Sequence, residues 1–336
     1  MGIKKHLVLI LSYCSILCAQ NEVCFDIVAN PNQSVAAFQG FTKYINVLDC
    51  FEVYAEPSIS DAKVLHAASV AAELLDNDED GTVDDQALKA ELASRGALIP
   101  ILTSEWSQAA NNFFDFYSGE GASAVLFNNE IDPSNTGHWG DDATVEEVVH
   151  VINHVGHVNI YPEIFDIEPN SSEMSDAMDI ARGGQFLTVP NSYPESAWYH
   201  YDDWTCDYGC MAIEYMYWAI VSNMGILNDP QTCNGIANEW EPCSPYLFEN
   251  TDTLMHAIIT DPIYTLPQLA PDGSYCPAGE VLGDSNADGV VNILDVIIAI
   301  NIVLGLEDYS SLSDINFDGV LDILDIVLIV NIILQT

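Results

Sequence analysis

Two consecutive stretches near the carboxyl end, GDSNADGVVNILDVIIAINIVLG (residues 283–305) and SDINFDGVLDILDIVLIVNIIL (residues 313–334), repeat one pattern. Each copy begins with Asp or Asn at alternate positions before a glycine, and each continues into an apolar run long enough for a helix. A repeat of this kind predicts two equivalent units that bury their apolar faces against each other. Neither apolar run is long enough to span a membrane, because polar residues interrupt both.

The alternating polar residues of each copy supply the donors that calcium requires. Ca²⁺ takes about six to eight hard oxygen ligands, and a glycine at the sixth position allows the loop to turn around the ion. The sequence therefore predicts two calcium loops. Their ligands are Asp284, Asn286, Asp288, Val290 through its carbonyl, Asn292 and Asp295 in the first copy, and Asp314, Asn316, Asp318, Val320 through its carbonyl, Asp322 and Asp325 in the second.

The paired loops, each closed by Asp at position twelve and followed by one helix, resemble a dockerin module. The resemblance covers residues 283–336 and implies a small all-α, EF-hand-like unit that folds on calcium. It also implies docking onto a cohesin-like domain or a cell-surface partner. Loop positions ten and eleven are Ile-Leu in both copies, and the unit contains no Lys or Arg. Dockerins of cellulose-degrading complexes typically carry Ser or Thr at those positions and basic residues further along the helix, so the resemblance does not identify the partner.

Charge excludes several classes of function. The chain has 336 residues, with 7 Lys and Arg against 51 Asp and Glu, so the formal net charge is −44. Such a surface repels phosphate backbones and anionic lipids, so we expect no nucleic-acid partner. It attracts divalent cations.

The amino terminus predicts export. Lys4 and Lys5 precede an apolar run from Leu7 to Leu17, and the chain turns polar after Ala19. Residues 1–20 are therefore interpreted as a signal peptide, and the mature chain as secreted, extracellular or cell-surface associated, with no transmembrane segment.

In an oxidising compartment most of the seven remaining cysteines should form disulfides. They are Cys24, Cys50, Cys206, Cys210, Cys233, Cys243 and Cys276. Cys233–Cys243 is the favoured pair because a short turn-rich loop separates them, and Cys24–Cys50 is the next. The odd count leaves one cysteine over. A zinc site at Cys206 and Cys210 is a less favoured alternative to disulfide bonding.

Composition divides the chain into a body (residues 21–270), a linker rich in Pro and Gly (residues 271–282) and the repeat region (residues 283–336). The body is predicted to be a helix-rich α+β domain. Helices are expected over residues 60–75, 84–94, 143–155, 175–181, 210–224 and 251–260, and short buried strands over residues 97–102 and 122–127.

A third calcium-like loop, LLDNDEDGTVDDQAL (residues 74–88, hereafter the body loop), lies between two of these predicted helices. Its expected ligands are Asp76, Asp78, Asp80, Thr82 through its carbonyl, and Asp84. Position twelve is Ala87, so a ligand must come from Asp85 or from water. The alternative is an acidic turn whose carboxylates cap the following helix.

The stretch EEVVHVINHVGH (residues 146–157) is the candidate transition-metal site. On a helix, Glu146, His150 and His154 share one face, and His residues four apart are a good metal pair. Glu147 and His150 match the helix of zinc metalloproteases, whose first histidine is replaced here by Glu146, so the resemblance is partial. A further ligand is expected from Glu214 or His200.

Two hypotheses follow for the body. In the first it is a metal-dependent hydrolase, a peptidase or a polysaccharide-degrading enzyme, with zinc or another transition metal and Glu147 as general base. In the second the histidines only make structural hydrogen bonds, and the protein is a non-catalytic extracellular binding or structural protein. The segment WYHYDDWTCDYGC (residues 198–210) places Asp202 and Asp203 among aromatic residues. This arrangement suits a sugar-binding cleft, but aromatic packing against a disulfide is the favoured interpretation.

Overall fold

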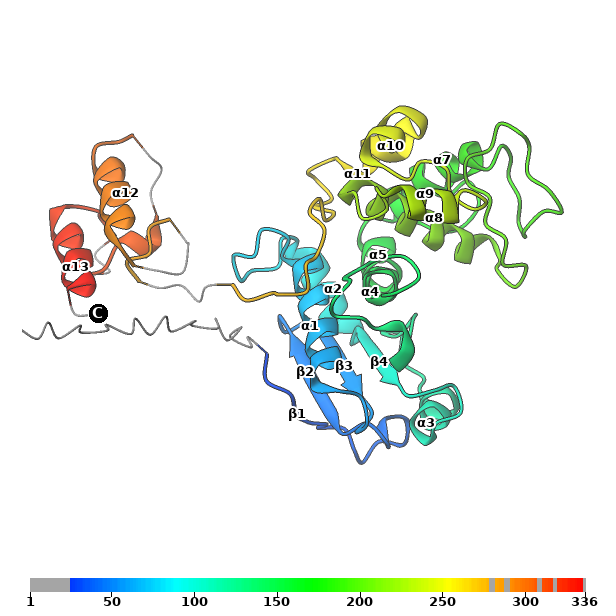
Figure 1. The fold of residues 1–336 in the computed structure, drawn as a ribbon, viewed down its shortest axis with the longest axis horizontal. Helices are drawn as coiled ribbons and strands as arrows, with labels where there is room; N and C mark the ends of the chain where they lie inside the picture. Colours follow the sequence, from blue (N-terminus) through cyan, green and yellow to red (C-terminus); the bar gives the residue numbers. More distant parts are fainter. Residues whose placement is uncertain (1–24, 278–281, 287–290, 307–309, 317–318, 335–336) are drawn as a thin grey trace, which may run out of the picture.

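The computed structural model describes residues 25–277, 282–286, 291–306, 310–316 and 319–334 (Figure 1). A β-sheet and a large group of helices make up the fold of the body, a mixture of helices and strands that is compatible with the expected α+β class. The predicted signal peptide, residues 1–20, lies outside the described residues. Among the described residues, no helix has the length and apolar character needed to cross a membrane.

The sheet found in the described residues has five strands in chain order: β1 (Val28–Ala29), β2 (Lys43–Val47), β3 (Phe51–Ala55), β4 (Leu98–Leu102) and β5 (Leu126–Phe127). The first three strands pair antiparallel, and β3, β4 and β5 pair parallel. Antiparallel neighbours need only a tight turn, whereas parallel neighbours need a crossover. Helices provide both crossovers.

Both faces of the sheet are covered. On one face, Val53 and Ile99 join the main apolar core, which α1 (Asp61–Leu75) and α4 (Thr144–Val151) help to build. On the other face, Tyr54 and Leu98 pack into a second core with α3 (Gln108–Phe116) and the 3₁₀ turn η1 (Ala36–Phe38). All five residues of β4 are buried. A strand covered on both faces must be apolar throughout, which explains why the sequence LIPIL could be predicted as a strand.

The helices α1 and α2 (Gln86–Arg95) confirm the prediction of helices on both sides of the body loop. Ser60 caps α1 by accepting from the Lys63 amide, and Asp85 caps α2 by accepting from the amides of Ala87 and Leu88. Helix α2 ends at Gly96, whose left-handed backbone (φ 66°) terminates the helix.

Helix α4 departs from the prediction. An uninterrupted α-helix was expected over residues 143–155, but α4 ends at Val151 and continues as a π-helix, η3 (Ile152–His157), and then as α5 (Val158–Ile160). Gly156 lies where α2 comes closest, because a β-carbon there would stand 2.3 Å from Leu88 Cδ1. Tertiary packing against α2 accompanies the change in helix type, and π-turns are frequent at functional sites.

The second half of the body is helical and is organised around α8 (Figure 1). Helix α8 contacts α4, α7, α10 and α11. Asp207 caps its first turn by accepting from the Cys210 amide, and Gly225 ends it with a left-handed backbone. The elements of this part are η2 (Asn128–Glu130), α6 (Pro162–Phe165), α7 (Glu173–Ala181), α8 (Tyr208–Met224), α9 (Pro230–Ile236), α10 (Pro245–Thr251) and α11 (Thr253–Ile259).

In the carboxyl-terminal repeat, α12 (Ile293–Val303) and α13 (Ile323–Ile333) follow the two predicted loops, and the turn η4 (Ser311–Ser313) lies between them. The two helices contact each other. They share an apolar cluster of their own, made of Val296, Ala299, Ile326 and Ile329.

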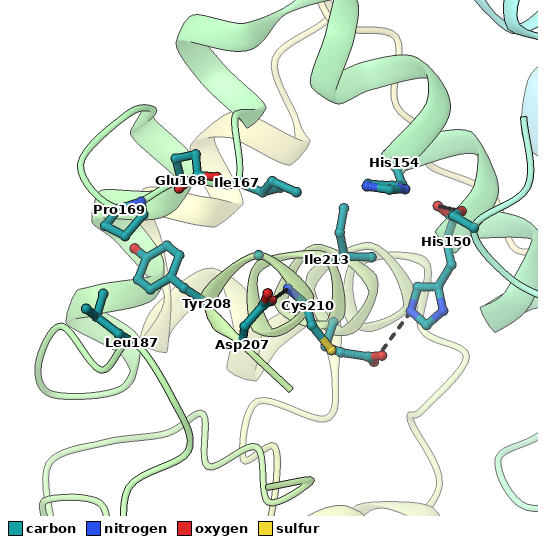
Figure 2. Close-up of a pocket in the computed structure, with 13 residues that line it drawn as sticks. His150, His154, Ile167, Glu168, Pro169, Leu187, Asp207, Tyr208, Cys210 and Ile213 are labelled. Carbon is teal, nitrogen blue, oxygen red and sulfur yellow. Dashed lines mark hydrogen bonds and ion pairs between the residues drawn. The ribbon is translucent and has the colours of Figure 1, made fainter. Parts of the chain in front are cut away.

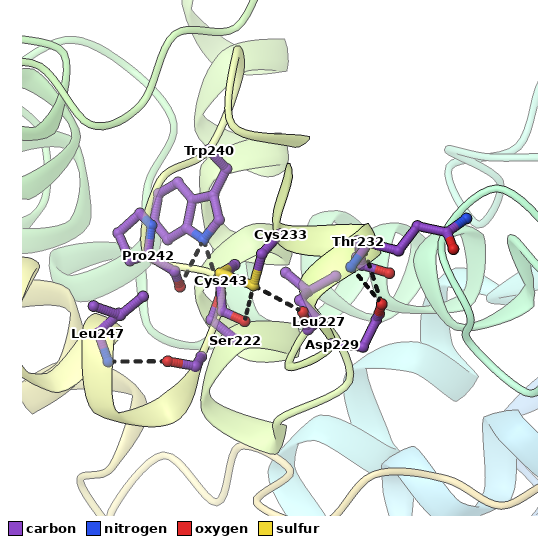
Figure 3. Close-up of a disulfide and its surroundings, with 11 residues drawn as sticks. Ser222, Leu227, Asp229, Thr232, Cys233, Trp240, Pro242, Cys243 and Leu247 are labelled. Carbon is purple, nitrogen blue, oxygen red and sulfur yellow. Dashed lines mark hydrogen bonds between the residues drawn. A yellow bond between two sulfur atoms is a disulfide. The ribbon is translucent and has the colours of Figure 1, made fainter. Parts of the chain in front are cut away.

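The cysteine predictions are partly confirmed. Cys233 is bonded to Cys243 as expected (Figure 3), and Cys206 is bonded to Cys210, so this pair forms a disulfide and not a zinc site. The expected Cys24–Cys50 bridge is wrong, because Cys50 is a free thiol buried in the main core. Cys24 lies outside the described residues, and Cys276 is disulfide-bonded.

Candidate metal centre

Helices α4 and α8 bring together the residues of the candidate metal centre. Helix α4 contributes Glu146, Glu147 and His150, whose ligand atoms all lie within 4.8 Å of one another. Helix α8 contributes Glu214, and its Oε2 atom lies 3.4 Å from His150 Nε2. The other ring nitrogen of His150, Nδ1, lies 3.8 Å from Glu147 Oε2. The structure therefore places Glu214 beside the α4 motif, as predicted.

Helix periodicity explains this arrangement. Residues three and four apart lie on one face of a helix, so Glu146, Glu147 and His150 project from α4 toward the same side. Glu214 is the only charged residue of α8, and that helix is otherwise largely buried. Contact between α4 and α8 puts Glu214 opposite His150.

His150 is buried among carboxylates. Its side chain is 10% exposed, and Nε2 has no hydrogen-bond partner although it faces Glu214. Burial alone would lower the pKa of His150, but the Glu214 and Glu147 carboxylates hold it well above its usual value. Once this imidazole loses its proton, its buried nitrogen, surrounded by acids, is well suited to bind a cation.

A fourth carboxylate, Glu239, interacts electrostatically with Glu146 and Glu214 and was not predicted. Burial raises the pKa of Glu239 to about 7, and the Glu214 charge adds to this increase. The hydrogen bond that Glu239 accepts from Trp218 Nε1 at 3.2 Å acts in the opposite direction and lowers the pKa. Burial likewise raises the pKa of Glu146 to about 7; His150 opposes this shift, while Glu147, Glu214 and Glu239 add to it. Several acidic groups thus share one poorly solvated volume with a single imidazole.

Glu239 was missed because its position depends on a long-range backbone arrangement. It precedes Trp240, which is fully buried and forms an isolated bridge with Tyr199. The Glu239 carbonyl accepts from the His200 amide at 2.7 Å. The loop that carries Glu239 is closed by the Cys233–Cys243 disulfide, and Trp240 Nε1 donates to Ser222 in α8 (Figure 3). Only the cysteine spacing in the sequence hinted that this loop is held in place.

Tyrosines surround the carboxylates. The Tyr217 ring lies edge-on to His150, with 5.4 Å between the ring centres. Burial raises the pKa of Tyr201 well above its usual value, and the nearby Glu214 carboxylate raises it further. Burial raises the pKa of Tyr217 well above its usual value, and the charges of Glu146 and Glu214 act in the same direction. These hydroxyls therefore stay protonated and can donate to carboxylates.

The remaining predicted ligands lie outside the cluster. His154 is exposed and lies with His150 in the wall of the same cavity (Figure 2). The π-helix that begins at Ile152 changes the spacing along this face, so the expected i, i+4 alignment of the two imidazoles does not hold. His200 instead has Nε2 2.9 Å from the Ala197 carbonyl.

Two of the candidate metal ligands, His150 and Glu214, line a cavity of about 630 Å³. His150 and His154 lie on one side of it, while Glu168, Pro169, Leu187 and Tyr208 lie on the other (Figure 2). Ser123 and Glu214 also line this cavity. A cluster of potential ligands at the wall of a cavity has the form expected of a binding or active site.

The acidic pair Asp202 and Asp203 does not form a two-carboxylate cleft. Both residues are exposed, and Asp203 accepts from the amide and the hydroxyl of Thr205. Tyr199, earlier in the same segment, packs against Tyr215 and Trp240. Aromatic packing therefore accounts for much of this segment.

In the body loop, Asp76, Asp78 and Asp84 have carboxylates close enough to hold one cation. Asp76 is fully buried and accepts from the Gly81 amide at 2.8 Å and from the Tyr275 hydroxyl at 2.5 Å. Asp80 accepts from the Thr82 amide. Asp85 was considered as a substitute ligand for position twelve, but it caps α2 and accepts from the Tyr161 hydroxyl. The capping role considered for this loop therefore falls to Asp85.

The two carboxyl-terminal loops are organised by their closing aspartates. Asp295 and Asp325 are fully buried. Asp295 accepts from the amides of Asn286 and Asn292, and Asp325 accepts from those of Ile315, Asn316 and Asp322. The predicted ligands Asp288, Val290 and Asp318 lie outside the described residues.

Comparison of the chain with protein-family models, curated proteins and solved structures finds no match.

Proposed function

We propose that the body binds one transition-metal ion, zinc being the best candidate, and hydrolyses a substrate held in the adjoining cavity. The observation that carries this proposal is the buried Nε2 atom of His150, which faces the Glu214 carboxylate without forming a hydrogen bond. Two ligand atoms that are each about 2.0–2.1 Å from a tetrahedral zinc ion lie about 3.4 Å apart. The separation of His150 Nε2 and Glu214 Oε2 is 3.4 Å, which fits a shared ion.

In this proposal Glu146, His150 and Glu214 are the metal ligands. Glu147 lies next to them, with Oε2 3.8 Å from His150 Nδ1, and we propose it as the general base. A bound metal ion would polarise a carbonyl and acidify a water molecule. Glu239 and the tyrosines at this site would hold the carboxylates in position through hydrogen bonds and charge.

Metal analysis of the mature chain tests the proposal. We expect one zinc or other transition-metal ion per chain after dialysis, lost in His150→Gln and in Glu214→Gln. The matched control is Glu249→Gln, an exposed residue of α10 that does not line the cavity. A mature chain that retains only calcium would contradict the metal centre and favour the alternative, a non-catalytic extracellular binding or structural protein.

For the carboxyl-terminal repeat we propose a dockerin-like, calcium-dependent docking unit of an exported protein. The buried closing aspartates support the calcium sites, and the exposed apolar side chains of α12 and α13 support docking onto a cohesin-like domain or a cell-surface partner. Those side chains are Ile293, Leu294, Ile297, Ile300 and Val303 in α12 and Ile323, Leu324 and Val327 in α13. Calcium-dependent retention of the full chain on a cohesin column, abolished by Leu294→Asp with Leu324→Asp, tests this. Equal retention in chelator would contradict it.

A further inference from the structure

A second hollow on the body adjoins the cavity of the candidate metal centre. This hollow, hereafter the aromatic groove, has a volume of about 390 Å³. Most of its lining residues are aromatic or aliphatic: Phe113, Phe114, Tyr117, Ala122, Ser123, Ala124 and Val125. Ser123 also lines the cavity of His150 and Glu214, so the two hollows meet at this residue. The Ser123 hydroxyl donates to the His150 carbonyl at 3.3 Å, which attaches the segment between the hollows to α4.

Contacts within the body hold the aromatic groove in shape. Tyr117 stacks on Phe113, with 4.7 Å between the ring centres, and its hydroxyl accepts from the Gly121 amide at 3.1 Å. The Gly121 carbonyl accepts from the amide of Leu98 in β4. Phe113 is buried in the second apolar core, whereas Phe114 is largely exposed. A bound group would therefore meet a preformed wall and would cover the Phe114 ring.

The side chains that line the aromatic groove carry no charge, and their polar atoms are the hydroxyls of Tyr117 and Ser123. Both hydroxyls already form hydrogen bonds within the body. A sugar ring carries hydroxyl groups on most of its carbons, and each one that is buried without a partner costs free energy. An aromatic side chain such as that of phenylalanine brings no such group and packs edge-on or offset against other rings. The aromatic groove therefore favours an aromatic amino-acid side chain over a sugar.

We propose that the aromatic groove is a substrate-specificity site of the metal centre, and that the body cleaves peptides with an aromatic side chain close to the scissile bond. The two hollows share Ser123, so one extended peptide can occupy both. This inference rests on the proposed hydrolase. The reaction is amide hydrolysis: the water oxygen bonds to the peptide carbonyl carbon, the carbon–nitrogen bond breaks, and a proton passes from water through Glu147 to the leaving amine.

Peptides that differ at one position test the selectivity. The full mature chain, loaded with zinc, is incubated with Ala-Ala-X-Ala-Ala, where X is phenylalanine, alanine or glutamate, and the cleavage site is identified by mass spectrometry. We expect kcat/KM to be about thirtyfold higher for phenylalanine than for alanine, as burial of most of an aromatic ring allows. Glutamate should be cleaved slowest, because an uncharged groove in a chain of net charge −44 disfavours an anion.

Two exposed phenylalanines of α3 provide a matched pair of variants. Phe114 is 56% exposed and lines the aromatic groove, whereas Phe116 is 59% exposed and does not line it. Phe114→Ala should lower the phenylalanine-to-alanine ratio about fivefold, because an aromatic wall is lost. Phe116→Ala should leave the ratio unchanged. Neither ring belongs to an apolar core, so both variants should fold.

Three results would overturn the proposal. The first is equal kcat/KM for the phenylalanine and alanine peptides in the parent chain. The second is a ratio that Phe114→Ala does not change, or that Phe116→Ala lowers equally. The third is hydrolysis of cellohexaose without cleavage of any peptide, which would leave the hydrolase standing with a polysaccharide as its substrate.

Binding separates failure of this inference from failure of the proposed hydrolase. If no substrate is cleaved, the proposed catalysis is wrong, and calorimetry with the full mature chain measures binding alone. Tighter binding of the phenylalanine peptide than of the alanine peptide, weakened in Phe114→Ala and retained in Phe116→Ala, supports the aromatic groove as the peptide site. Equal or absent binding overturns it.

Discussion

The body loop and the second carboxyl-terminal loop begin alike and are completed differently. In both loops the glycine at position six donates its amide to the first aspartate at 2.8 Å, Gly81 to Asp76 and Gly319 to Asp314. The carboxyl-terminal loop then closes on Asp325, whereas the body loop has Ala87 at the same position and is closed by packing. Two loops that begin in the same way can thus be stabilised either by a ligand within the loop or by distant segments of the chain.

Residues 268–275 provide the packing for the body loop. Tyr275 donates to Asp76, the amides of Gly273 and Ser274 donate to Glu73, and Asn77 exchanges hydrogen bonds with Leu269. The carboxyl-terminal loop is instead covered by a small apolar cluster between α12 and α13. We therefore expect the body loop to keep its structure without calcium and the carboxyl-terminal loops to lose theirs.

Calcium removal should give the largest difference between the two regions. A chelator should leave the repelling carboxylates of both carboxyl-terminal loops unbalanced, and their small core cannot compensate. We expect α12 and α13 to lose protection in hydrogen exchange while α1 and α2 keep theirs. Asp295→Ala with Asp325→Ala should give the same loss in calcium. Unchanged protection of α12 and α13 in chelator would show that these loops are ordinary acidic turns.

Removing the first aspartate of each loop should give the second-largest difference between the two regions. Asp76→Ala leaves two backbone amides and the Tyr275 hydroxyl without a buried acceptor, which should cost about 3 kcal/mol of body stability. Asp314→Ala, the matched change in the repeat, should not alter unfolding of the body. Urea titration in chelator, followed by tryptophan fluorescence, measures both, because no tryptophan lies in residues 283–334. A body destabilised equally by both variants would contradict independent loops.

Acidity should affect the body loop through Glu73. Burial raises the pKa of Glu73 to about 6, although the amides of Gly273 and Ser274 oppose the shift. A carboxyl with a raised folded-state pKa stabilises the fold most below its unfolded-state value of about 4.5 and loses that contribution as pH rises past 6. Body stability in chelator should therefore fall by about 2 kcal/mol from this group between pH 4.5 and pH 7.

Glu73→Gln provides the control for this pH effect. The difference in unfolding free energy between the parent chain and the variant isolates Glu73 from the other carboxylates, which titrate in both. A difference that stays constant with pH would show that Glu73 does not titrate in this range.

The smallest expected effect tests the hydroxyl that closes the body loop. Tyr275→Phe removes the hydrogen bond to Asp76 but keeps the stacking of this ring on Phe25. We expect a loss of about 1–2 kcal/mol in body stability, since the acceptor carries a charge and is buried. No change in the urea midpoint would mean that the backbone amides alone hold Asp76.

Local sequence patterns predicted several of the elements and part of the candidate metal centre. The Asp85 side chain begins α2 and Gly96 ends it, and the apolar run of β4 forms a buried strand, so these elements could be read without knowledge of their neighbours. The same holds for Glu146, Glu147 and His150, which helix spacing alone places on one face. Strand β2 and its hairpin partner β3 were not predicted individually. The turn between them requires positive φ at Leu48 and Asp49. Leu and Asp are not the residues that usually mark such a turn, so the sequence offered little indication of it.

Local sequence is sufficient for the mixed helix-and-strand character of the fold, the first half of each loop and the motif on α4, because each depends on residues within a few positions of one another. Four features depend on tertiary structure: α4 is followed by a π-helix, Glu239 comes near Glu146 and Glu214, Cys50 stays unpaired, and Tyr275 closes the body loop. These features depend on contacts between residues far apart in the chain. Such contacts arise only when the apolar faces of the elements pack together, and no local spacing encodes which distant side chain will then be adjacent.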